Sequence, residues 1–239
     1  NPKNLIAQNK VASSLSAKFK ATGDIKLLHQ SDSLYKEVIL NQAKKTSGPW
    51  LGLATNAITQ HLFKKANEYL DSASTIGDEP YATLLMKYDV AMELGNFDLA
   101  GNYLNQIGNK NSFQYLIRNA KYLDYLGDLD AAIVSMEKAL AYAESGNNRT
   151  LKLWSKSNLG DMYGHAGRVE DSYHAYLEVL ALDSTYDYAL KGIAWVNYAH
   201  DNNLVESTRI LKSLSKKKSN PDYYLTLAEI ADAEGNTQL

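Results

Sequence analysis

The sequence contains no cysteine, few prolines and no long apolar run. Without cysteine the chain cannot form disulfides, thiolate metal sites or a cysteine nucleophile. Proline disfavours the interior of a helix, so the long stretches between Pro2, Pro49, Pro80 and Pro221 permit helix nearly throughout. No apolar run approaches the roughly 18 residues of a membrane-spanning helix, and we therefore expect no membrane span.

The chain also lacks an excess of charge of either sign. Its 25 lysines and arginines nearly balance its 27 aspartates and glutamates, which gives a formal net charge of −2 over 239 residues. The electrostatic field of so small a net charge is too weak to attract nucleic acid or an anionic membrane, so no nucleic-acid partner is expected. Hydrophobic residues make up 45% of the chain, an ordinary share for a globular protein with a buried core.

Signatures of catalysis and metal binding are missing as well. We find no glycine-rich phosphate loop, no Gly-x-Ser-x-Gly elbow and no His-Glu-x-x-His pair. The five histidines are nowhere three or four residues apart, the spacing that places two ligands on one helix face. The sequence therefore predicts no metal, no cofactor and no enzymatic activity.

What the sequence does contain is a repeated turn signal. Its clearest copies are Gly23-Asp24-Ile25, Gly95-Asn96-Phe97 and Gly127-Asp128-Leu129, and looser copies start at residues 61, 167, 202 and 235. Glycine can adopt the left-handed conformation that ends a helix, and the Asp or Asn that follows can cap the next one. Each copy is therefore predicted to be the tight turn of a helix hairpin.

Two further columns of residues keep step with these turns. Three residues after the apolar position stands a small residue, at Ala66, Ala100, Ala132, Ser172 and Ser207. Four residues later stands a bulky one, at Leu70, Leu104, Met136, Tyr176 and Leu211. A small residue lets two helices approach closely, and a bulky one fills the gap between them one turn later. In the first copy Leu28 replaces the small residue.

These columns resemble the tetratricopeptide-repeat family, whose period is about 34 residues and whose first helix reads Trp-x-x-Leu-Gly-x-x-Tyr. Parts of that pattern stand at Leu159-Gly160-Asp161-Met162-Tyr163 and Trp50-Leu51-Gly52. Trp195 and Tyr88 depart from it, because a small residue is usual at their positions. The resemblance implies an all-α fold, a right-handed superhelical solenoid of antiparallel helix hairpins.

One such solenoid is predicted over the whole chain, residues 1–239. Six complete hairpins are expected at 4–46, 47–80, 81–112, 113–150, 151–186 and 187–220, followed by a lone or capping helix at 221–235. Because the chain stops soon after Gly235, we expect either a terminal cap or a natural chain that continues past Leu239. Because it begins with Asn1 rather than Met, we also expect that an upstream segment was removed, by processing or by cloning.

The resemblance also implies a protein or peptide partner, held on the concave face that the first helices line. Projection from the turns places these candidate binding residues on that face: Asp89, Lys121, Asp124, Tyr125, Trp154, Asn158, Asp161, His165 and His200. Trp154 is the most suggestive, because tryptophan often contributes strongly to interfaces, although a core position suits it equally well. Some family members clamp a partner's C-terminal carboxylate, but only Asn158 matches that clamp here.

Two alternatives to a non-enzymatic protein-binding scaffold stay open. The first is an exported, envelope-associated module that binds a glycan or an assembly partner, suggested by the absent cysteines, the missing start methionine and the many tyrosines and asparagines. The second is a regulatory segment of a longer multidomain protein. The sequence is therefore compatible with both a cytoplasmic and an exported or periplasmic location, and it predicts no oligomeric state.

Overall fold

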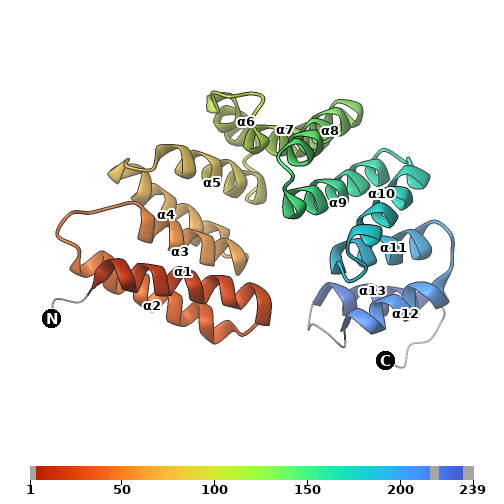
Figure 1. Cartoon of the computed structure of the whole chain (residues 1–239), viewed down its shortest axis with the longest axis horizontal. Helices are drawn as coiled ribbons and strands as arrows, with labels where there is room; N and C mark the ends of the chain where they lie inside the picture. Colours follow the sequence, from red (N-terminus) through yellow and green to blue (C-terminus); the bar gives the residue numbers. More distant parts are fainter. Residues whose placement is uncertain (1–3, 216–220, 234–239) are drawn as a thin grey trace. The chain divides into compact units, whose positions relative to one another are not determined.

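The computed structural model describes residues 4–215 and 221–233, and this part of the chain is all-α (Figure 1). The chain divides into two compact units, Asn1–Asn109 and Lys110–Leu239. The helices of the first unit are α1 (Leu5–Thr22), α2 (Ile25–Asn41), α3 (Gly48–Thr59), α4 (Phe63–Ile76), α5 (Pro80–Glu93) and α6 (Phe97–Gln106). Those of the second are α7 (Phe113–Leu126), α8 (Leu129–Ser145), α9 (Arg149–His165), α10 (Val169–Leu182), α11 (Asp187–Ala199), α12 (Leu204–Ser215) and α13 (Pro221–Ala233).

Successive helices pair as hairpins within each unit. The first unit holds α1 with α2, α3 with α4 and α5 with α6; the second holds α7 with α8, α9 with α10 and α11 with α12. The last described helix, α13, packs on α12. The all-α fold of six complete hairpins and a further helix is thus confirmed for the described residues. The predicted turn at Gly235 lies outside them, and the handedness and continuity of one solenoid stay predictions.

Each turn within a hairpin contains a residue in the left-handed conformation, as the repeated signal predicts. The φ angle lies between 70° and 79° at Gly23, Gly95, Gly127 and Gly167, and it is 57° at His61 and 52° at Asn202. A side chain in this conformation costs about 1–2 kcal/mol, which explains why glycine is favoured there. The predicted capping occurs at Asp24 and Asp128, which accept the backbone N–H groups of Lys26 and Ala131. The side chain of Asn96 makes no such hydrogen bond.

The small and bulky columns form the buried seam of the hairpins. The small residues Ala66, Ala100, Ala132, Ser172 and Ser207 are completely buried, and the bulky ones are at most 5% exposed. Ser207 satisfies its buried hydroxyl by donating to the carbonyl of Ala194 at 2.8 Å. Both columns therefore have the packing role that their spacing predicts.

Two tyrosines pack where glycines leave room for an aromatic ring. Tyr176 of α10 lies between α9 and α11, and a Cβ added at Gly160 or Gly192 would stand 2.7 Å or 2.4 Å from its ring. In the first unit Tyr35 of α2 lies in the same way against Gly52 of α3, where a Cβ would stand 2.3 Å from the ring. Glycine at these positions thus makes space for a ring, a more specific role than close helix packing.

A buried polar cluster joins the first three helices. Asn56 of α3 is 1% exposed, and its amide donates to Ser31 at 2.9 Å and to the carboxylate of Asp32 at 2.8 Å. Its oxygen accepts the hydroxyl of Ser16 from α1 at 2.7 Å. Ser31 in turn donates to the carbonyl of Ala12 at 2.9 Å. One asparagine thus links α1, α2 and α3 through side-chain hydrogen bonds.

Candidate functional site

The second unit carries a surface built from the first helices of its hairpins, α7, α9 and α11, which we call the first-helix surface. On α9 the candidate residues recur every three or four positions, which puts them on one helix face: Trp154, Asn158, Asp161 and His165. On α11 the same spacing holds for Tyr188, Lys191 and Trp195. Because α9 contacts α11, these two faces meet.

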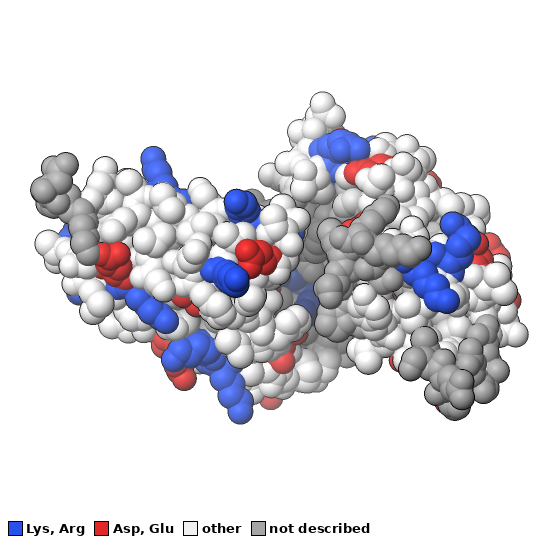
Figure 2. All heavy atoms as spheres, turned by 90° about the horizontal axis from the view of Figure 1, so that it is seen from below, with Lys and Arg blue, Asp and Glu red and all other residues white. Residues whose placement is uncertain are grey.

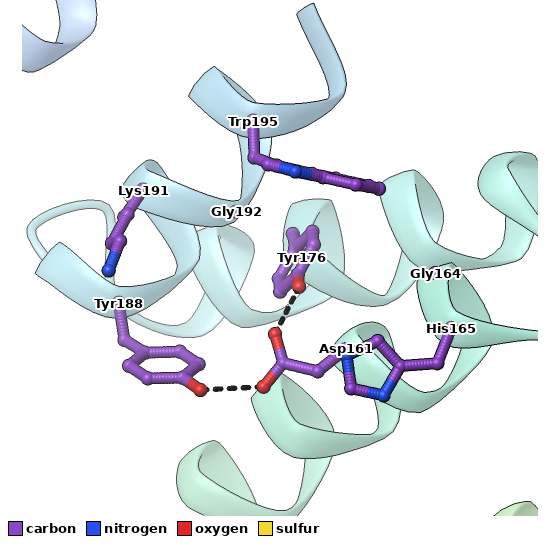
Figure 3. Close-up of a pocket in the computed structure, with 8 residues that line it drawn as sticks. All are labelled: Asp161, Gly164, His165, Tyr176, Tyr188, Lys191, Gly192 and Trp195. Carbon is purple, nitrogen blue, oxygen red and sulfur yellow. Dashed lines mark hydrogen bonds between the residues drawn. The ribbon is translucent and has the colours of Figure 1, made fainter. Parts of the chain in front are cut away.

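A cavity of about 270 Å³ opens where the two faces meet (Figure 3). Its lining comes from three helices, with Asp161, Gly164 and His165 from α9, Tyr176 from α10, and Tyr188, Lys191, Gly192 and Trp195 from α11. Two of the predicted binding residues, Asp161 and His165, are therefore part of one cavity. That they bind a partner stays a prediction.

The carboxylate of Asp161 is held in the cavity by two tyrosine hydroxyls. Tyr176 donates to one of its oxygens at 2.5 Å and Tyr188 to the other at 2.6 Å. Burial raises the pKa of Asp161, while the two hydrogen bonds and the charges of His165 and Lys191 act against that rise. Burial and the neighbouring Asp161 also raise the pKa of both tyrosines, so both hydroxyls are protonated donors at neutral pH.

Trp195 bounds the cavity on the side away from Asp161. A Cβ at Gly164 would stand 3.5 Å from the indole, so the indole reaches from α11 to the backbone of α9. In the view of Figure 3 the ring of Tyr176 lies between the indole and the Asp161 carboxylate, with its hydroxyl toward the carboxylate. The side chain remains 44% exposed. Trp195, which departs from the small residue usual at its position in the family, thus places an accessible aromatic ring in the same cavity as the partly buried carboxylate of Asp161.

A second polar contact joins α7 to α9 within the first-helix surface. The Nδ1 atom of His165 lies 3.0 Å from the carboxylate of Asp124, so the structure brings one further predicted residue, Asp124, against His165. Next to them Tyr125 is 46% exposed and contacts the ring of Tyr122, with centroids 6.1 Å apart. Lys121, on the same helix, is also exposed.

Trp154 has features of both roles that the sequence allows. It is 36% exposed, and its ring packs edge-on against Phe113, with centroids 6.1 Å apart. The amide of Asn158 donates to the Trp154 carbonyl at 2.8 Å, which fixes that amide along the helix. The tryptophan is therefore anchored on one edge and accessible on the other.

The two remaining candidates do not line this cavity. Asp89 is a partly buried residue of α5 in the other unit. His200 is the C-terminal cap of α11, and its Nδ1 atom lies 2.7 Å from the carboxylate of the neighbouring Asp201. A binding role for Asp89 and His200 stays a prediction.

The cavity residues of α11 were not among the predicted ones, although their spacing was visible in the sequence. Projection from the turn at Asn202 pointed to His200, yet Val196, one helical turn before it on the same face, is 2% exposed in the core. In the other hairpins the left-handed residue comes one or two positions after the first helix ends, whereas Asn202 comes three positions after Ala199. This longer turn shifts the accessible face by one residue, to Trp195.

Two further features are absent from the described residues. No helix among them is both long and apolar enough to cross a membrane. Residues 4–215 and 221–233 also contain no group of three or more histidine, aspartate or glutamate side chains arranged to hold a metal ion.

Because the pKa of Asp161 is raised in the folded unit, we expect this residue to make the wild type less stable as the pH rises. An unfolded aspartate ionises near about 3.9. Between that value and the raised pKa the folded state binds more protons, so the free energy of unfolding falls with rising pH. Asp161→Asn removes this contribution. The stability of the wild type relative to the variant, measured by urea unfolding, should therefore decrease from pH 4 to pH 7, and an increase would contradict the assignment.

No protein-family model and no curated protein matches the sequence at a significant level. Solved structures match its fold. A chain of the APC/C hetero-tetramer Cut9–Hcn1 has a TM-score of 0.70 over 97% of this chain at 17% identity. Yeast Tom70 has a TM-score of 0.66 over 100% at 13% identity. A tetratricopeptide repeat protein from Parabacteroides merdae has a TM-score of 0.63 over 95% at 14% identity.

These similarities establish the fold of the chain. It is a tetratricopeptide-repeat-like helical solenoid, as its resemblance to that family implies. The chain spans 43% of the Cut9–Hcn1 chain, 56% of Tom70 and 88% of the Parabacteroides protein. Partners of those proteins do not transfer to this chain, because a shared fold does not imply a shared function.

Proposed function

We propose that the chain is a non-enzymatic scaffold whose first-helix surface in the second unit binds a peptide segment of another protein. The observation that carries this proposal is the concentration of accessible aromatic side chains on α7, α9 and α11. Exposed fractions there are 46% for Tyr125, 36% for Trp154, 48% for Tyr188 and 44% for Trp195. Clustered, accessible tyrosine and tryptophan side chains are typical of binding surfaces.

The polar groups of the same surface support a peptide rather than a purely apolar ligand. The Asp124–His165 pair and the tyrosine-bound Asp161 lie beside the aromatic rings. Peptide sites commonly combine apolar contact area with a few fixed polar groups that set orientation. Stacked hairpins also offer an extended surface, which suits an extended ligand.

Selection of displayed random peptides on the immobilised protein tests this function. We expect enriched peptides that bind the wild type at least tenfold more tightly than a Trp154→Ala/Trp195→Ala double variant, as measured by fluorescence anisotropy. Val205→Ala is the matched control, because Val205 on α12 is 79% exposed and lies outside this surface. The proposal fails if no peptide is enriched, or if the double variant binds the enriched peptides as well as the wild type does.

A further inference from the structure

The cavity between α9 and α11 has the size of one amino-acid side chain. Sites for drug-sized ligands measure about 300–1,000 Å³, whereas this cavity measures about 270 Å³. It opens to solvent beside Tyr188 and Trp195, which are both about half exposed. A peptide lying along the first-helix surface could therefore place a single side chain into it.

The floor of the cavity carries a negative charge that neutral groups hold in place. Each oxygen of Asp161 accepts one tyrosine hydroxyl, so each retains capacity for a further hydrogen bond. The hydroxyls orient the carboxylate without neutralising it. His165 pairs with Asp124, and both His165 and Lys191 line the cavity, where their charges favour the ionised form of Asp161.

The wall opposite this carboxylate is aromatic. The indole of Trp195 spans the cavity from α11 to Gly164, and the ring of Tyr188 stands at its side. Aromatic faces attract cations, and tryptophan does so most strongly. A planar guanidinium can stack on such a face while its edge donates hydrogen bonds to a carboxylate.

We propose that this cavity binds the guanidinium of an arginine side chain on the peptide partner, with Asp161 as its counter-ion and Trp195 as its stacking surface. This assignment rests on the proposed function, since it names the side chain that the same surface recognises. Tyr176 and Tyr188 act as positioning residues, because they hold the carboxylate oxygens in place.

An acidic ligand fits the cavity less well. Its carboxylate would approach Asp161 at close range, and like charges at such distances repel. Figure 2 shows basic and acidic side chains interspersed on one face of the molecule, and the formal net charge of the chain is only −2.

Titration of the ¹⁵N-labelled protein with small probes tests this inference. The probes are N-acetyl-arginine amide, its uncharged analogue N-acetyl-citrulline amide, and N-acetyl-glutamate amide, and the readout is the Trp195 indole N–H resonance, assigned with Trp195→Phe. We expect the arginine probe to shift this resonance and to bind at least tenfold more tightly than the citrulline probe. Equal binding of these two probes, or tighter binding of the glutamate probe, would overturn the proposal.

Two substitutions distinguish the effect of the Asp161 carboxylate from the effect of the overall charge of the protein. Asp161→Asn should weaken binding of the arginine probe at least tenfold, whereas Asp130→Asn, the same charge change at an exposed site on α8, should leave it unchanged. Should Asp161→Asn fail to fold, Trp195→Ala tests the opposite wall. Equal losses in both aspartate variants, or wild-type affinity in Trp195→Ala, would contradict the assignment.

The outcome is distinguishable from failure of the proposed function. If displayed peptides bind the first-helix surface but the arginine probe does not bind the cavity, the scaffold function stands and the arginine assignment is wrong. If the probe binds and no peptide is enriched, the cavity recognises guanidinium groups without an extended peptide site. Absence of both results removes the two proposals together.

Discussion

Replacing Gly192 with alanine is expected to destabilise the second unit by about 3 kcal/mol, the upper end of the usual cost of overpacking a core. The new methyl group would stand 2.4 Å from the ring of Tyr176, well inside van der Waals contact. The ring has little room to retreat toward α9, because it already packs against the backbone of Gly160, where an added Cβ would stand 2.7 Å from it. Tyr176 is itself 3% exposed, so no rotation into solvent relieves the clash.

Urea unfolding followed by circular dichroism measures this effect as a lower midpoint. Gly48→Ala is the matched control, because Gly48 starts α3 and no atom lies within 4 Å of an added Cβ; we expect it to change stability by less than about 1 kcal/mol. Replacing the Tyr176 ring with a smaller side chain should relieve the clash. Gly192→Ala should therefore lower the free energy of unfolding by less than about 1 kcal/mol in a Tyr176→Leu background. An equal cost in both backgrounds would show that the ring is not the cause.

The part of this fold that the sequence predicts is the part that local chemistry determines. Position 127 favours glycine because its backbone is left-handed, a conformation in which a side chain is strained. Asp128 then caps the next helix by accepting the backbone N–H of Ala131. Each effect acts within a few residues, so it can be recognised without knowing the rest of the chain. The column of small residues can be recognised in the same way, because a small residue such as Ala132 is needed and buried where the two helices of a hairpin pack closely.

The cavity escaped prediction because it depends on three helices at once. Tyr176 was assigned to the core from its column, which is correct for its ring, but its hydroxyl reaches Asp161 of α9. Trp195 stood out only as a departure from a small position. Its partner Gly164 lies 31 residues earlier, and no spacing rule within one helix connects the two. The longer turn at Asn202 then moved the accessible face of α11 by one residue.

The buried cluster around Asn56 was invisible for the same reason, since Ser16, Ser31 and Asp32 come from two other helices. A single asparagine gives no periodic signal, and its helix position alone does not distinguish a buried amide from an exposed one. The polar side chains that carry specific interactions in this chain thus depend on contacts between helices. The apolar columns that build the helices do not.

Asn56→Asp is expected to lower the stability of the first unit by about 3 kcal/mol at pH 7, the size of an uncompensated buried charge. The substitution keeps the shape of the side chain but replaces its amide donor with a carboxylate oxygen. That oxygen would face the acceptor Asp32, 2.8 Å away in the wild type. Because Asn56 is 1% exposed, the new carboxylate would be largely removed from water and poorly solvated beside Asp32.

The pH dependence of this loss identifies its cause. Burial and the neighbouring Asp32 should raise the pKa of the new carboxyl above its unfolded value of about 3.9, so the folded variant binds a proton that the unfolded chain releases. Stability relative to the wild type should therefore fall as the pH rises through this window. Near pH 4 a protonated carboxyl can donate to Asp32 as the amide did, so most of the loss should disappear.

Asn67→Asp provides the matched control for this prediction. Asn67 on α4 also donates to an aspartate, Asp71, at 3.2 Å, but the contact is exposed to solvent. Like charges four residues apart on an exposed helix face cost only about 0.2–0.5 kcal/mol, so this variant should unfold nearly as the wild type does at both pH values. Similar losses in the two variants would mean that charge alone, and not burial beside Asp32, sets the cost. A loss in Asn56→Asp that does not change with pH would instead point to altered packing among α1, α2 and α3.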